Sequence, residues 1–148
     1  MRLYSFAHSF LGPIHKGIQT AHVVSEMASK FDDGAGDDGN MQTFLEWAGG
    51  HKTIIILEGG NSDNMLTIRG MVAQCSRTLK LPYTWFCEDA ETLNGMMTAV
   101  GIIVPAEIYE GEFCEAPMMT PEETLILGDE QQTKRILYSL IRTGRLAN

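Results

Sequence analysis

Two histidines, a lysine and a glutamine stand close together in the segment LGPIHKGIQTAH, residues 11–22. His15, Gln19 and His22 are spaced i, i+4 and i+7, so on a helix all three lie on nearly the same face. Imidazole and amide groups on one face can line a single pocket. Lys16 adds a cation at the start of the predicted helix, where free backbone N–H groups favour anions. This segment is the first candidate for a reactive site.

The spacing argues against a metal ion bound by the two histidines alone. On a helix, His15 and His22 are separated by roughly 10 Å along the axis, whereas metal–ligand bonds measure about 2 Å. Neither a metal nor a cofactor is predicted. A simpler alternative is that His15 and Lys16 are solvated at the first helical turn and that His22 is a hydrogen-bonded histidine under a loop. Spacing alone leaves that alternative open.

A second polar cluster lies in CEDAETLNGMMT, residues 87–98, between two predicted strands. Ligands gather at loops that follow strands in open sheets, and carboxylates beside hydroxyls can orient a water or a ribose. The alternative is a polar hairpin without a ligand. The candidate side chains here are Glu88, Asp89, Glu91, Thr92, Asn94 and Thr98.

Familiar catalytic motifs are missing from the sequence. There is no GxSxG elbow and no HExxH, and the glycine-rich GGNSDN lacks both GxGxxG and the Walker lysine. Cys75, Cys87 and Cys114 are odd in number and never form a CxxC pair, so we expect reduced thiols.

The first predicted helix runs from Ile14 to about Lys30 and follows a strand over residues 2–9 that a Gly-Pro turn ends. Apolar and small residues recur in it at intervals of three and four, which predicts a face packed closely on a sheet. These residues are Ile14, Gly17, Ile18, Ala21, Ser25 and Ala28. The acidic, glycine-rich segment 32–40 that follows is predicted to be a mobile surface loop.

The remaining pattern predicts an α/β fold. KTIIILEGG, residues 52–60, is a continuous apolar run, which predicts a central strand buried on both faces. Strands separated by helical segments favour a three-layer α/β/α arrangement around a four-stranded mixed sheet. The other predicted elements are a short helix over 41–47, a helix over 65–79, and strands over 83–88 and 98–104.

Beyond Pro105 the chain changes character, and we expect two parts: an α/β domain over residues 1–105, and an acidic linker with a C-terminal helical extension over residues 106–148. Thr120, Pro121 and Glu123 form a capping box. A later helix carries an apolar stripe and closes near Gly144. That stripe could dock on a partner protein or on a second copy, and a homodimer is the expected assembly.

Composition limits the possible partners. The net charge is −8, which argues against broad binding to nucleic-acid backbones, because such affinity comes from lysine and arginine. No apolar run approaches the roughly 18 residues that a membrane helix needs. No secretory signal is visible at the N-terminus, so a cytoplasmic location is expected.

Three stretches, in this order, resemble the type-2 peptidyl-tRNA hydrolase family, and more closely a diverged group of phage and bacterial proteins with that fold. KGIQTAH is similar to the family's lysine-then-AAQCAHA segment and matches it at Gln19, Ala21 and His22. FLEWAGGHKTIIILEGG is similar to the family's tryptophan-bearing helix, which is followed by its central strand. In CEDAETLNGMMTAVGIIVP, Glu88 stands at the family aspartate. The resemblance covers residues 3–105.

The resemblance implies hydrolysis of the ester that joins a peptidyl or aminoacyl group to the ribose at the 3′ end of tRNA. His22, paired with Glu88, would activate water, and either Lys16 or His15 would hold the terminal phosphate or the developing oxyanion. Substrate contacts are expected from Gln19, Thr92, Asn94 and Thr98. The alternative is an inactive member that binds a small nucleotide-derived ligand in a phage or prophage context.

Overall fold

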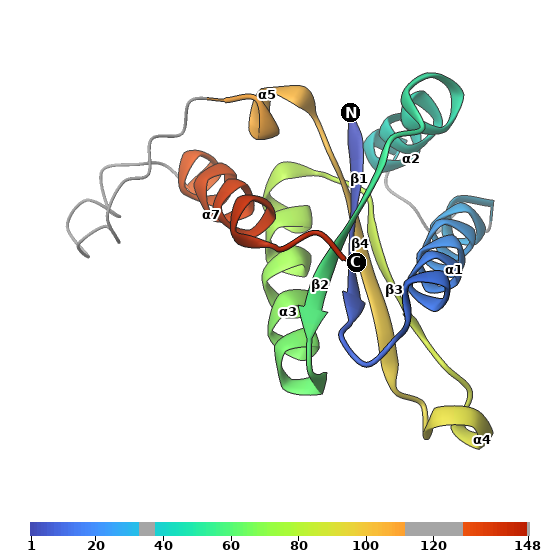
Figure 1. Ribbon diagram of the computed structural model, residues 1–148. Coiled ribbons are helices and arrows are strands. Elements are labelled where there is room, and N and C mark those ends of the chain that lie inside the picture. Colours follow the sequence, from blue (N-terminus) through green and yellow to red (C-terminus); the bar gives the residue numbers. More distant parts are fainter. Residues whose placement is uncertain (33–37, 112–128, 148) are drawn as a thin grey trace.

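The computed structural model describes residues 1–32, 38–111 and 129–147, and it contains one four-stranded mixed sheet (Figure 1). The strand order is β2-β1-β4-β3; β1 runs parallel to β2, and β4 runs antiparallel to both β1 and β3. The predicted α/β class and mixed sheet are confirmed. The strands are β1 (Arg2–His8), β2 (Ile54–Gly60), β3 (Tyr83–Cys87) and β4 (Met97–Val104).

Helices lie on both sides of this sheet. Figure 1 shows α1 and α2 on one side and α3 and α7 on the other. The strands place apolar side chains on both sides of the sheet, because consecutive residues of a strand point to opposite faces. Leu3 and Ile103 pack with Met27 of α1, whereas Phe6 and Ile102 belong to the second apolar cluster, beside α3. The helical segments are α1 (Pro13–Asp32), α2 (Asp38–Glu46), η1 (Trp47–His51), α3 (Ser62–Leu79), α4 (Ala90–Leu93), α5 (Ala106–Tyr109) and α7 (Asp129–Thr143).

The prediction that residues 52–60 form a central strand is wrong, because β2 lies at the edge of the sheet. The central strands are β1 and β4, and β4 is buried at every position. The outer edge of β2 is nevertheless paired. The Glu58 N–H donates to the Arg145 carbonyl at 2.8 Å, and the Ala147 N–H donates to the Ile56 carbonyl at 3.0 Å. The C-terminal segment therefore covers this edge. The apolar residues of β2 are thus not on an unpaired edge strand, which would favour aggregation.

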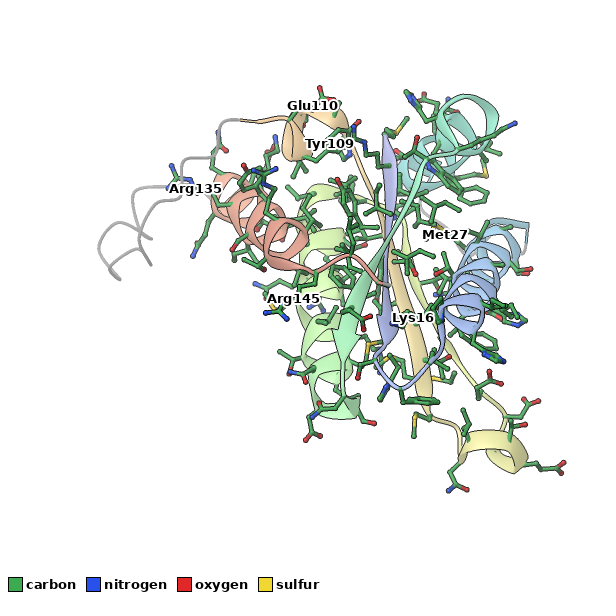
Figure 2. All side chains as sticks on the ribbon, in the orientation of Figure 1. Lys16, Met27, Tyr109, Glu110, Arg135 and Arg145 are labelled. Atoms are coloured by element: carbon green, nitrogen blue, oxygen red, sulfur yellow. The ribbon has the colours of Figure 1, made fainter. Side chains whose placement is uncertain are left out.

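The predicted sheet-facing side of α1 is also wrong. Ile14 is 78% exposed and Ile18 is 45% exposed, while the buried residues of the helix include Lys16 and Gln19 near its start and Met27 further along. Figure 2 shows Lys16 and Met27 on the side of α1 that faces the sheet. Polar residues can be buried there because the sheet supplies partners for them.

Two other predicted segments differ in detail. Helix α2 begins at Asp38, so residues 38–40 are helical instead of belonging to the predicted loop, and residues 33–37 lie outside the described ranges. Helix α2 continues directly into the π-helical turn η1, which extends the short helix predicted over 41–47. The predicted acidic linker begins with the short helix α5, and its residues 112–128, which include the capping box at 120–123, lie outside the described residues.

The C-terminal helix α7 packs against α3. Leu137 is fully buried and Ile141 is 5% exposed, and both join the apolar cluster that contains Phe6 and Val72. The apolar stripe predicted for this helix is therefore covered within the chain. The division at residue 105 and the homodimer both remain predictions. None of the helices described here is long and apolar enough to cross a membrane.

Candidate functional site

The candidate residues gather at one end of the sheet. Strands β1, β2 and β3 all finish at this end and β4 starts there, because β4 is antiparallel to its two neighbours. Helices α1 and α3 begin here, and the β3–β4 connection carries α4 at the same end (Figure 1). The two polar segments singled out in the sequence therefore meet at the carboxyl ends of the strands, where open α/β sheets commonly bind ligands.

A chain of hydrogen bonds joins three of the predicted residues. The Thr98 hydroxyl donates to Oε1 of Gln19 at 2.8 Å, and Nε2 of Gln19 donates to Oε1 of Glu88 at 2.6 Å. Thr98 is fully buried and Gln19 is 5% exposed, whereas Glu88 is half-buried. Because the hydroxyl fixes the direction of the amide, the carboxylate is held by one of its oxygens. A carboxylate held in this way can accept a proton from water through the other oxygen.

Lys16 and Glu58 form an ion pair beside this chain. The Lys16 side chain is 5% exposed and that of Glu58, on β2, is 29% exposed. His15, the competing basic residue, is exposed at the first turn of α1. Burial therefore separates the two candidates: the ammonium of Lys16 faces the sheet, and the imidazole of His15 faces solvent.

His22 lies one turn beyond Gln19 and stacks on Phe86 of β3, with ring centroids 4.3 Å apart and ring planes 12° apart. It is exposed, and no hydrogen bond joins it to Glu88. Thr92 and Asn94 are exposed on the β3–β4 connection. The structure thus brings Gln19, Glu88 and Thr98 into one network, whereas His22, Thr92 and Asn94 are exposed and have no hydrogen bond to it.

Sequence reasoning missed three polar residues at this end of the sheet. Glu58 is the one acidic residue within the apolar run of β2, and a carboxylate in such a run is a detectable signal. His8 ends β1, and its Nε2 lies 3.2 Å from the hydroxyl oxygen of Ser62, at the start of α3. These two residues are 54 positions apart, and no local pattern connects them.

The cysteines differ in accessibility. Burial raises the pKa of the Cys75 thiol to about 11, so this thiol stays protonated near neutral pH. Cys87 is exposed at the end of β3, and Cys114 lies outside the described residues. Within the described ranges, no three side chains of the His, Cys, Asp and Glu types are grouped to hold a metal ion.

Comparison of the sequence with models of known protein families and with curated proteins finds no match.

Proposed function

We propose that this protein hydrolyses the ester between a peptidyl or aminoacyl group and the ribose at the 3′ end of tRNA. The observation that carries the proposal is the hydrogen-bond chain from Thr98 through Gln19 to Glu88. Ester hydrolysis by water needs a positioned base, and the orientation of the Glu88 carboxylate is fixed by the buried amide of Gln19. The resemblance of the two polar segments to type-2 peptidyl-tRNA hydrolases supports the same chemistry.

Each nearby side chain has a role that fits its position. Glu88 accepts the proton of the attacking water, and His22, exposed beside it, assists that transfer when substrate is bound. The ammonium of Lys16 has three N–H donors, so it can stabilise a developing oxyanion while remaining paired with Glu58. Thr92 is exposed and can contact the ribose, whereas buried Thr98 serves to hold Gln19.

The test is cleavage of a charged tRNA by the purified full chain. We expect Glu88→Gln to lower the cleavage rate by about 10²- to 10⁴-fold, the range that general-base catalysis contributes. His22→Ala should also lower the rate. The matched control is Glu26→Gln, which removes an exposed carboxylate of helix α1 outside the hydrogen-bond chain and should cleave at the original rate.

Two results would contradict the hydrolase proposal. One is cleavage no faster than in buffer, and the other is equal activity of the Glu88→Gln and Glu26→Gln variants. Melting curves of all variants establish that lost activity does not come from unfolding.

A second candidate is binding of a small nucleotide-derived ligand without turnover. The net charge of −8 and the pairing of Lys16 with Glu58 favour a compact ligand, which needs fewer cations than a tRNA. A panel of mononucleotides should then contain one that raises the melting temperature and is recovered unchanged after denaturation. A degraded ligand would exclude this second candidate.

A further inference from the structure

A pocket lies at the same end of the sheet but on the side of α3. Its volume is about 300 Å³. It is formed by the start of α3, the end of the β3–β4 connection and the start of β4. Four of the side chains that line it are apolar and two are polar: Ser62, Leu66, Leu93, Asn94, Met96 and Met97. Mostly apolar walls with a few polar groups are typical of small-molecule sites, and this volume is at the small end of their range.

A buried histidine fixes one of the two polar groups. His8 is 6% exposed, and its Nδ1 accepts the N–H of Phe10 at 3.4 Å. The Phe10 ring also meets the imidazole edge-on, with centroids 4.6 Å apart. The accepted N–H leaves Nδ1 without a proton, so in the neutral ring Nε2 carries the proton and donates to the Ser62 oxygen.

This tautomer decides what Ser62 can do. Because His8 donates to the hydroxyl oxygen, it cannot at the same time remove the hydroxyl proton, which argues against a serine nucleophile. The hydroxyl of Ser62 instead keeps its own proton for another acceptor. Burial lowers the pKa of His8, which keeps the ring neutral near pH 7.

The hydroxyl of Ser62 is not used to cap α3. The cap residue is Asn61, whose side chain accepts the backbone N–H of Asn64, while the Asn64 side chain accepts the N–H of Asn61. Ser62 is exposed and lines the pocket. It is therefore available as a hydrogen-bond donor to a ligand.

We propose that the pocket binds the apolar part of an N-acylated aminoacyl group. The Ser62 hydroxyl donates to its amide carbonyl oxygen, which is distinct from the ester carbonyl oxygen that becomes the oxyanion, and the hydrocarbon part contacts Leu66, Leu93 and Met97. The inference builds on the proposed function, in which this group is the acyl part of the ester. Met97 and Thr98 are consecutive in β4 and point to opposite faces, so the pocket and the Gln19–Glu88 pair flank the same end of that strand. Unbranched methionine side chains adapt to acyl groups of different shape.

The test uses N-acetyl-leucinamide and N-acetyl-glycinamide, titrated into the isotope-labelled full chain and followed by NMR. We expect the leucine compound to shift the amide signals of Ser62, Leu66 and Asn94, and the glycine compound to bind about tenfold or more weakly. Leu66→Lys should weaken leucinamide binding by a similar factor, because it places a charge in the pocket. The matched control is Leu45→Lys: Leu45 is 52% exposed on α2, and Leu66 is 58% exposed.

Ser62→Ala tests the polar contact separately. We expect it to weaken leucinamide binding about threefold to tenfold, the usual effect of one hydrogen bond. Ser25→Ala, at an exposed position of α1, should bind as the original chain does.

The inference is overturned if leucinamide shifts no pocket signals, if both compounds bind equally, or if Leu66→Lys binds like Leu45→Lys. Failure of the hydrolase proposal looks different. Leucinamide binding without cleavage of charged tRNA would keep the acyl-group site and remove only the hydrolysis. Cleavage without leucinamide binding would keep the hydrolase and remove the acyl-group site.

Discussion

Gln19 connects the two polar segments of the candidate site, residues 11–22 and residues 87–98. Its amide oxygen accepts from Thr98 and its amide nitrogen donates to Glu88, so each end of the side chain has a chemically matched partner. A buried polar group without a partner costs about 1–3 kcal/mol. The matched partners make burial of this amide acceptable, and they also fix the direction of the Glu88 carboxylate.

At the same scale, His8 makes stability depend on pH. Burial lowers its pKa below the ordinary value of 6.5. The unfolded chain therefore takes up the imidazole proton at a higher pH than the folded chain, so the free energy of unfolding decreases as the pH falls below about 6.5. When the pH is lowered from about 7.5 to about 5.5, we expect the melting temperature of His8→Gln to fall less than that of the original chain.

The control for this pH dependence is His51→Gln, because His51 is exposed at the end of η1. This variant should keep the pH dependence of the original chain. Equal losses of melting temperature in His8→Gln and the original chain would contradict the assignment to His8.

At the scale of elements, the close contact of α1 with the sheet allows its polar residues to reach their partners. A Cβ atom built on Gly101 of β4 would lie 2.5 Å from Cγ1 of Val23, so only glycine leaves room for this approach. Near the start of the helix, the Thr20 hydroxyl oxygen lies 2.9 Å from the Ser5 hydroxyl oxygen of β1, and Lys16 forms an ion pair with Glu58. The packing of one helix thus supplies both the core contact and the polar site.

Helix α7 is expected to contribute to the stability of the fold. Leu137 is fully buried in the cluster beside α3. Leu137→Ala should lower the free energy of unfolding by about 2–5 kcal/mol, because it removes buried methyl groups and leaves a cavity. Urea denaturation measures this change. Leu45→Ala, at a 52% exposed position, should stay within about 0.5 kcal/mol of the original chain. Equal costs for the two variants would show that α7 is not packed as described.

At the scale of the whole molecule, the two ends of the sequence contribute to one sheet. Residues 145–147 pair with the outer edge of β2, while β1, the first strand, lies on its inner edge (Figure 1). Deletion of residues 144–148 should expose the Glu58 N–H, which donates to Arg145 in the full chain. We expect faster hydrogen exchange at Glu58 in the shortened chain, measured by NMR.

The internal control for this exchange experiment is the amide of Val100, in the fully buried central strand β4. Its exchange should not change. Unchanged exchange at Glu58 would mean that the C-terminal segment does not protect the edge of β2.

The sequence identified three side chains of the candidate site but not their arrangement. Gln19, Glu88 and Thr98 were all identified as candidates, because spacing along a helix and a polar connection between two strands are local signals. Their joining in one chain of hydrogen bonds was not predictable from spacing, since Gln19 and Thr98 are 79 positions apart. The link between His8 and Ser62 was missed for the same reason, because it depends on the parallel pairing of β1 with β2.

By itself, the sequence determined the α/β class and the approximate positions of most strands and helices, because apolar periodicity and turn residues act locally. Only the tertiary structure decided which side of α1 faces the sheet and where β2 lies in it. The reason is that burial depends on partners as well as on polarity. Glu58 and Ser5 make polar burial possible on α1, and the distant C-terminal segment covers the edge of an apolar strand.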